Sequence, residues 1–249
     1  MNGLSAPRMP GATLVTRLKV YDTVTPDGQR GGTPHFHFLC TEMYFVLNGT
    51  GAVELIDGQG FSRVDLMPYS ALVFTPGTIH RLINPNGDLE ILVVMQNSGL
   101  PERGDNIVCF SDEWLADKDR YAEAMRVTTV EDAYVRRDRG VEGFLKLKAA
   151  FEVDPEKGCV ALRQIYQRAS QLIDSQKDEW GAVIEGGAVT EADASMQKLQ
   201  LLKENEIDYL FGAQHFLIEA QNYSTLGFCG HLNRYFDPAT LMPEGIRQA

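Results

Sequence analysis

Hydrophobic residues follow two different periods along this chain. Up to about residue 97, short apolar and β-branched runs alternate with turn-forming segments such as Asn48-Gly49 and residues 84–88. The runs lie at residues 13–21, 42–47, 51–56, 71–74, 80–83 and 89–95. Many short strands separated by glycine- and proline-containing turns are typical of an all-β sandwich or barrel. We therefore expect an antiparallel β-domain in the first hundred residues.

The second part of the chain has a helical period. Between residues 156 and 184, apolar side chains recur at steps of three and four, which indicates one face of an amphipathic helix; they are Leu162, Ile165, Tyr166, Ala169, Leu172 and Ile173. Thr190 followed by Asp193 matches the pattern of a helix N-cap, and a second stripe extends from Met196 to Leu217. Because Gly186-Gly187 separates the two stretches, we predict a helical hairpin, with shorter helices at 111–125 and 129–137.

Charge narrows the classes of function. The 249 residues include 23 basic and 34 acidic side chains, a formal net charge of −11. Such a chain is poorly suited to nucleic acid or to anionic membrane surfaces. Its apolar runs are shorter than the ~18 residues of a membrane span, and its first residues do not resemble a signal peptide. We expect a cytoplasmic protein with a small-molecule substrate, and we expect its four dispersed cysteines to be reduced thiols.

Three of the five histidines lie in the β-rich part and form a candidate metal site. His35 and His37 are two residues apart, so on a strand their imidazoles face the same side. Glu42 begins the next apolar run, and His80 belongs to a distant strand after the Pro76-Gly77 turn. Two neighbouring strands and one remote strand can bring these four side chains to one point inside a barrel.

This set of side chains predicts a divalent transition metal. Three neutral imidazoles and one carboxylate suit Mn, Fe, Co, Ni or Zn better than Ca or Mg. On a six-coordinate ion, four protein ligands leave two open positions, where a substrate could chelate or bind beside dioxygen or water. The alternative is that all three are ordinary strand histidines, which their spacing and the nearby glutamate disfavour.

The same residues resemble two motifs of the cupin superfamily. The resemblance covers about residues 13–97 and consists of two runs: His35-x-His37-x4-Glu42-x6-Gly49, which is similar to the first motif, and Gly77-Thr78-Ile79-His80-x3-Asn84, which is similar to the second. The resemblance implies an all-β cupin jelly-roll barrel in which His35, His37, Glu42 and His80 are the metal ligands.

Some turn positions depart from the cupin pattern. The glycines that usually open the two motifs are replaced by Gln29 and Tyr69, and Thr75 stands where the second motif usually has its proline. A turn with positive φ would be costly at Tyr69. These departures affect turn geometry and leave the four ligands in place.

We predict a metal-binding barrel at residues 13–97, followed by a mostly α-helical C-terminal extension at residues 105–249. The extension is expected to pack on the barrel or at an oligomer interface, where it could cover the barrel mouth or form the interface of a homodimer; the alternative is that it makes a separate small domain. The favoured function is a metal-dependent enzyme acting on a small organic molecule by dioxygenase- or oxidoreductase-type chemistry on Fe or Mn, with Zn, Ni or Co as alternatives. The alternative functions are a metal-assisted isomerase, epimerase or lyase, and a non-enzymatic small-molecule-binding cupin.

Strand parity suggests which other side chains surround the site. Tyr44 shares a face with Glu42 and is the candidate catalytic residue, as a hydrogen-bond partner of the substrate or as a proton shuttle. Asn84 shares a face with His80 and is expected to form a turn, whereas Arg81 is expected to face away.

The sequence also suggests positions for two more histidines, a glutamine and a cysteine. Gln96 at the end of the last strand is a candidate for the barrel mouth, as is His231 in a glycine-rich loop. Cys40 is expected to be a buried filler, and His215 a packed or surface residue of the helical stripe.

Overall fold

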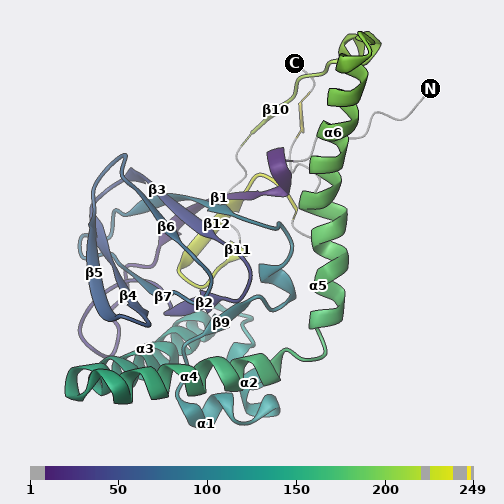
Figure 1. The fold of residues 1–249 in the computed structure, drawn as a ribbon. Helices are drawn as coiled ribbons and strands as arrows, with labels where there is room; N and C mark the ends of the chain where they lie inside the picture. The colour runs from purple at the N-terminus through teal and green to yellow at the C-terminus, as the bar shows by residue number, and fades with distance from the viewer. Residues whose placement is uncertain (1–8, 220–224, 238–245, 248–249) are drawn as a thin grey trace.

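The computed structural model describes residues 9–219, 225–237 and 246–247 (Figure 1). Its strands are β1 (Leu14–Val20), β2 (His35–His37), β3 (Glu42–Asn48), β4 (Gly51–Asp57), β5 (Gly60–Leu66), β6 (Ala71–Phe74), β7 (Ile79–Ile83), β8 (Glu90–Met95), β9 (Asn106–Val108), β10 (Leu217–Ile218), β11 (Thr225–Leu226), β12 (Gly230–Arg234) and β13 (Ile246–Arg247). Its α-helices are α1 (Asp112–Leu115), α2 (Lys118–Met125), α3 (Val130–Val153), α4 (Pro155–Leu172), α5 (Lys177–Ile184) and α6 (Thr190–Lys203). A π-helical turn, η3 (Glu185–Val189), joins the last two, and 3-10 turns form η1 (Pro10–Ala12), η2 (Pro101–Arg103) and η4 (Asp208–Gly212).

The β-part consists of two antiparallel sheets that face each other. The larger sheet has the order β11-β12-β1-β8-β3-β6, and the smaller has the order β5-β4-β7-β2-β9. The predicted antiparallel β-domain is therefore confirmed. In the described residues, however, its strands form an open sandwich of two sheets instead of one continuously hydrogen-bonded barrel.

The strands β7 and β2 of the smaller sheet are covered on both faces. All five residues of β7 and all three of β2 are buried, so these strands lack the alternation that a one-sided sheet shows. On the inner face, apolar side chains from both sheets form one core, which includes Leu18, Val46, Val53, Leu82 and Ile91. On the outer face, α3 and α4 lie across the sheet (Figure 1) and form a second core, which includes Phe36, Ile79, Phe144, Leu147 and Leu162.

The helix α3 is much longer than the segment 129–137 predicted from the sequence. It begins at a capping box of Thr129 and Asp132 and continues to Val153. Gly140 and Gly143, which weaken a local helical pattern, have a packing role here. A Cβ atom would lie 2.8 Å from the Val108 side chain if added at Gly140, and 2.2 Å from the Cys109 carbonyl oxygen if added at Gly143. The glycines therefore allow α3 to lie directly against the chain that follows β9.

The apolar stripe of α4 is buried as predicted. Leu162, Ala169, Leu172 and Ile173 are buried, and Ile165 and Tyr166 are partly buried against the same core. Trp180 on α5 is buried as well, and its indole N–H donates to the Arg103 carbonyl oxygen at 2.9 Å. These helices thus share a core with residues of the β-part.

The predicted helical hairpin at Gly186-Gly187 is wrong. The chain continues as one helical rod from α5 through η3 into α6, and Thr190 has helical dihedral angles instead of forming an N-cap. Its hydroxyl donates to the Glu185 carbonyl oxygen at 2.6 Å. The π-turn accommodates the glycines without ending the helix, and Gly187 leaves room for η1, because an added Cβ would lie 3.3 Å from the Ala12 Cβ.

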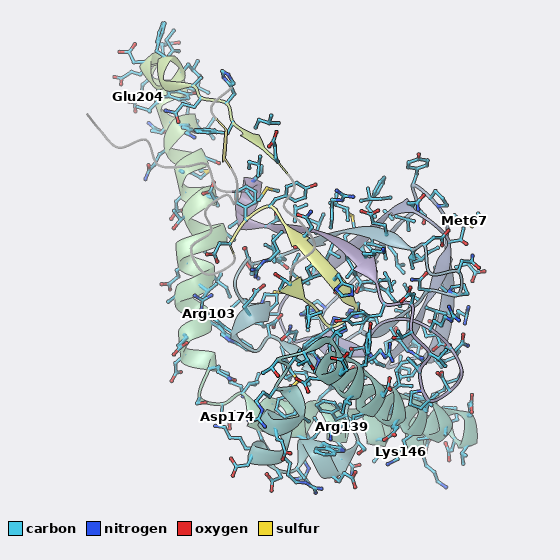
Figure 2. All side chains as sticks on the ribbon, turned by 180° about the vertical axis from the view of Figure 1, so that it is seen from behind. Met67, Arg103, Arg139, Lys146, Asp174 and Glu204 are labelled. Atoms are coloured by element: carbon cyan, nitrogen blue, oxygen red, sulfur yellow. The ribbon has the colours of Figure 1, made fainter. Side chains whose placement is uncertain are left out.

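The second apolar stripe is not covered within the described residues. In the described chain α6 has no buried residue, and Met196, Leu199, Leu202 and Leu210 are exposed. Phe211, which belongs to the same predicted stripe, is 86% exposed. Figure 2 shows why: the rod rises from Asp174 at its foot to Glu204 at its far end and extends beyond the sheets.

The C-terminal region also supplies strands, which the sequence analysis missed. β9 pairs with β2, and β12 pairs with β1 from Thr16↔Arg234 to Val20↔Gly230. A segment interpreted as a loop thus lies along an edge of the larger sheet. Among the described helices, none is long and apolar enough to cross a membrane.

Candidate metal centre

The two sheets bring all four predicted ligand residues together. β2 carries His35 and His37, β7 carries His80, and β3 of the opposite sheet carries Glu42. His35 and His80 are paired in the ladder between β2 and β7. One side-chain donor atom from each of the four residues lies within 4.8 Å of the others, and no residue of the four is more than 5% exposed. The cluster therefore could hold a metal ion.

The protons of two of the histidines point away from the centre of the cluster. His35 Nδ1 lies 2.9 Å from the Thr33 carbonyl oxygen, and His80 Nδ1 lies 3.0 Å from the Thr78 carbonyl oxygen. Since a carbonyl only accepts, each Nδ1 must carry the proton. The Nε2 atoms of these residues lie 3.1 Å apart, so the ring nitrogens that are not bonded to the backbone both face the centre of the cluster, where one cation could bind both.

The spacing of the donor atoms fits a small divalent ion. Glu42 Oε2 lies 3.0 Å from His80 Nε2 and 3.3 Å from His37 Nε2. Two ligands about 2.1 Å from an ion and at right angles to each other are about 3.0 Å apart. Glu42 Oε2 and both ring nitrogens of His37 are buried without a geometrically good hydrogen bond. Three imidazoles and a carboxylate in this arrangement fit a divalent transition metal.

Asp105 orients His37, and sequence reasoning missed it. Its Oδ2 lies 3.3 Å from His37 Nδ1, and its side chain is fully buried. The carboxylate also accepts from three successive backbone N–H groups, at 3.1 Å from Phe38, 2.7 Å from Leu39 and 3.2 Å from Cys40. A carboxylate that holds a ligand histidine by its second nitrogen fixes the orientation of the ring. Asp105 lies outside both motifs, so no local pattern indicated it.

The electrostatics of the cluster depend on the same contacts. Burial alone would raise the pKa of Glu42, but the nearby His80 and His37 outweigh it and hold that pKa below its usual range. Burial lowers the pKa of His35 well below its usual value. Burial would also lower the pKa of His37, but the carboxylates of Asp105 and Glu42 beside its ring raise it to about 9. His35 is thus a neutral nitrogen donor facing an ionised carboxylate.

A cavity of about 240 Å³ opens beside the cluster. Most of its lining is apolar, and its polar lining includes the cluster residues His35, His37 and Glu42. The apolar side chains are Leu14, Leu18, Val93, Met95, Pro101, Leu226, Phe228 and Leu232. Such a wall suits a small organic molecule better than a heavily hydroxylated one.

Tyr44 also lines the cavity and is almost completely buried. Its ring lies edge-on to His80, with 5.9 Å between ring centroids, and to Phe74, with 4.8 Å. Burial and then the charge of Glu42 raise the pKa of Tyr44 well above its usual value.

The C-terminal segment 225–234 supplies much of the far wall, through residues other than the His231 that the sequence suggested. Thr33 Oγ1 donates to the Phe228 carbonyl oxygen at 2.5 Å and anchors this segment beside β2. The Phe228 ring then lies edge-on to His35 at 5.1 Å between centroids. Arg136 on α3 completes this side of the cavity.

Two side chains near the motifs have structural roles, as predicted. Asn84 Nδ2 donates to the Val20 carbonyl oxygen at 3.1 Å, and Asn84 Oδ1 accepts from the Leu89 N–H at 3.1 Å, so this residue ties the turn together. Arg81 faces away from the cluster and is fully buried, where it pairs with Asp27 at 2.7 Å and Glu54 at 3.3 Å.

The remaining candidates lie away from the cavity. Gln96 is exposed, and its Oε1 accepts from the Thr41 N–H at 3.2 Å. His231 packs against Tyr21, with 5.4 Å between ring centroids, although its strand borders the cavity. Cys40 is a buried filler as predicted, whereas His215 is exposed and lies outside any helix.

The turn before β6 shows how the chain departs from the usual second motif. Tyr69, which stands where a glycine was expected, has φ = 70°. The turn is therefore kept in spite of the strain that a side chain adds there. The Tyr69 side chain is exposed, so it meets no packing conflict.

Comparison with solved structures finds similar proteins of several kinds. A TDP-fucose-3,4-ketoisomerase from Campylobacter jejuni has 17% identity over 33% of this chain and 58% of that chain, with a TM-score of 0.28. The DMSP lyase DddQ from Ruegeria pomeroyi has 20% identity over 34% of this chain and 39% of that chain, with a TM-score of 0.27. A predicted oxalate decarboxylase from Thermotoga maritima has 21% identity over 34% of this chain and 64% of that chain, with a TM-score of 0.26. This chain thus spans less than two thirds of the length of each.

A family comparison identifies the fold of the β-part. No curated protein matches the sequence. Residues 22–95 match the family model described as "Cupin domain", and this segment contains both motifs and all four residues of the cluster. Residues 22–95, with their paired antiparallel strands around a buried His/Glu cluster, therefore form a cupin domain.

Proposed function

We propose that this chain is a metal-dependent enzyme that carries out dioxygenase- or oxidoreductase-type chemistry on a small organic molecule. The observation that carries the proposal is a buried three-histidine, one-carboxylate cluster that opens onto a cavity with mostly apolar walls. His35, His37, Glu42 and His80 would hold the ion, with Fe or Mn favoured and Zn, Ni or Co as alternatives. When bound, the metal would supply Lewis-acid or redox chemistry.

The residues of the chain itself have separate roles in this proposal. Phe228 and the aliphatic wall exclude water and hold the apolar part of the substrate. Asp105 keeps the His37 ring in its orientation through the 3.3 Å contact. Tyr44 is the candidate catalytic residue, because its buried side chain lines the cavity beside Glu42 and His80 and could donate a hydrogen bond to the substrate.

A metal-assisted isomerase, epimerase or lyase is the second candidate. It is supported by the position of Tyr44, the one phenol among the described residues that line the cavity. A non-enzymatic small-molecule-binding cupin is the third. We also propose that residues 13–97 are the metal-binding unit and residues 105–249 the extension packed on it. A cytoplasmic location and a homodimer are further proposals, the latter in keeping with the exposed apolar side chains of α6.

Metal analysis of the ligand variants tests the site. Protein purified without chelator or nickel resin should contain about one divalent transition ion per chain. Since even indirect contacts to a ligand change affinity by ~10–100-fold, His35→Ala and His80→Ala should be largely metal-free. Circular dichroism should show both variants folded, because the core around the cluster is apolar. Full metal occupancy in both variants would show that the site is misassigned.

Dioxygen uptake separates the reaction classes. An oxygenase should consume dioxygen at an oxygen electrode when given its substrate, and should be inactive under strict anaerobiosis. Full anaerobic turnover would remove the leading proposal and favour the proton-transfer alternative. Tyr44→Phe should lower activity in either class while leaving metal content unchanged.

A further inference from the structure

Among the described residues, three arginines are almost completely buried, and one of them differs from the others. Arg81 is paired with the carboxylates of Asp27 and Glu54. Arg137 is paired with Asp138. Arg136 is only 5% exposed, yet among the described residues no carboxylate forms an ion pair with it.

The guanidinium of Arg136 also has unused hydrogen-bonding capacity. Its Nη2 donates to the Gly227 carbonyl oxygen at 2.9 Å, but its Nε is buried without a partner. Burial lowers the pKa of Arg136, and an arginine nevertheless stays protonated in proteins. A buried charge without a counter-charge is costly. This arrangement indicates that the counter-charge comes from a molecule outside the chain.

Arg136 lies at the wall of the cavity next to the His/Glu cluster. The residue lines that cavity together with His35, His37 and Glu42. Its guanidinium lies over the Phe228 ring, 4.5 Å from the centroid. The same ring contacts His35 edge-on at 5.1 Å, so Phe228 lies against both the arginine and the cluster. A molecule in the cavity can therefore reach both.

Building on the proposed function, we propose that Arg136 binds the carboxylate of a small, otherwise apolar acid seated in this cavity. A guanidinium offers parallel N–H groups that match the two oxygens of a carboxylate. Leu18, Val93, Met95 and Leu226 line the cavity and suit an aliphatic or aromatic body. The volume of about 240 Å³ lies below the ~300–1,000 Å³ of typical ligand pockets, so the acid is small.

The other charged groups of the wall are consistent with this assignment. Arg234 also lines the cavity, as does the exposed Glu102 of opposite charge. A divalent ion held by Glu42 would have a net charge near +1, which adds to the positive potential at this end of the cavity. The mostly apolar wall favours a monocarboxylate with an apolar body over a polyanion such as phosphate.

Calorimetric titration of metal-free protein tests the role of Arg136. The chelator-treated full chain is titrated with 3-methylbutanoate, with benzoate, and with their uncharged amides. In the absence of an ion, a carboxylate cannot bind through the metal. We expect the acids to bind at least about tenfold more tightly than the amides, which corresponds to ~1.4 kcal/mol. Arg136→Gln should remove that preference and leave the affinity for the amides unchanged.

Arg139→Gln is the matched control. Arg139 lies one turn further along α3 (Figure 2), over the Trp114 ring at 4.4 Å, and does not line the cavity. This variant should bind the acids as the wild type does. If Arg136→Gln fails to fold by circular dichroism, Arg136→Lys replaces it. Arg136→Lys keeps the charge, loses the forked geometry, and should bind the acids several-fold more weakly.

Several outcomes would overturn the proposal. They are equal binding of the acids to wild type and to the Arg136 variant, no binding of either acid to the wild type, and tighter binding of inorganic phosphate than of the acids. Metal content is measured separately and should be unchanged in Arg136→Gln. Failure of the proposed metal site would appear in the metal content, whereas failure of the carboxylate site would appear only in the titrations.

Discussion

At the scale of single residues, Asp105 links the His/Glu cluster to the backbone beside it. The carboxylate accepts from the N–H groups of Phe38, Leu39 and Cys40 and contacts His37 Nδ1 from the same position. The turn after β2 and the orientation of the His37 ring are therefore held by one side chain. A change at Asp105 should affect metal affinity more than a typical surface change would.

Asp105→Asn is expected to weaken metal binding by about 10–100-fold, because an amide orients the histidine less strongly than a carboxylate does. Competition with a chromophoric chelator measures the affinity, and thermal unfolding reports any loss of stability from the three backbone hydrogen bonds. Asp65→Asn is the control, since the Asp65 side chain is 83% exposed. Unchanged affinity in Asp105→Asn would show that His37 is oriented without this contact.

The ion pair between Asp27 and Arg81 should make stability depend on acid pH. Burial would raise the pKa of Asp27, but hydrogen bonds and the charge of Arg81 lower it to about 2, against ~3.9 in an unfolded chain. The stabilisation is therefore complete above about pH 4 and is lost as the pH falls from about 4 to about 2. Asp27→Asn should cost about 1–2 kcal/mol at pH 6. In urea unfolding, the difference between wild type and Asp27→Asn should shrink towards pH 2, and a difference independent of pH would contradict this assignment.

The candidate site was predictable from the sequence only where its residues follow a local rule. His35 and His37 share a face because strand side chains alternate, and Glu42 and His80 have the spacing of the two motifs. Asp105, Arg136 and Phe228 reach the site from segments whose own patterns describe other elements. Their positions result from tertiary packing, which no short window of sequence records.

At the scale of elements, the local sequence pattern predicted the packing of α4 but did not predict that α5 and α6 form one continuous rod. The α4 stripe is both periodic and buried, so its pattern predicted its packing. Gly186-Gly187 matched a helix end by local preference, but the π-turn and the contact with η1 kept the rod continuous. Glycine lowers helix propensity by about 1 kcal/mol, which tertiary contacts can outweigh.

Leu172→Asp should be strongly destabilising. Leu172 is buried at the end of α4 in a cluster with Val108, Phe110 and Leu115. The substitution removes an apolar contact and leaves a charge in an apolar site, which should cost about 3 kcal/mol or more. Val160→Asp on the same helix is the control, because Val160 is 59% exposed. Urea unfolding measures both variants, and equal stability of the two would show that the α4 stripe does not carry the packing.

At the scale of the whole molecule, the C-terminal region adds strands to both sheets of the β-part and helices to its core. β9 extends the smaller sheet, β12 extends the larger one, and α3 and α4 cover the outer face of the smaller sheet. Arg136 and Phe228 come from this region and line the cavity. The extension therefore contributes to the core, to the sheets and to the candidate substrate pocket.

A fragment ending near Gly99 should consequently fail as an independent unit. It would expose Phe36, Ile56 and Ile79, which now pack against Phe144 and Leu162, and burial of each large apolar side chain is worth roughly 1.5–3 kcal/mol. It would also lack Asp105, so the His37 ring would lose its orienting partner. We expect the fragment to be poorly soluble and to bind metal more weakly than the full chain, as measured by light scattering and metal analysis. A soluble, monomeric fragment with the thermal stability and metal content of the full chain would show that the extension is an independent appendage, because neither the outer core nor the orientation of His37 would then depend on residues beyond the motifs.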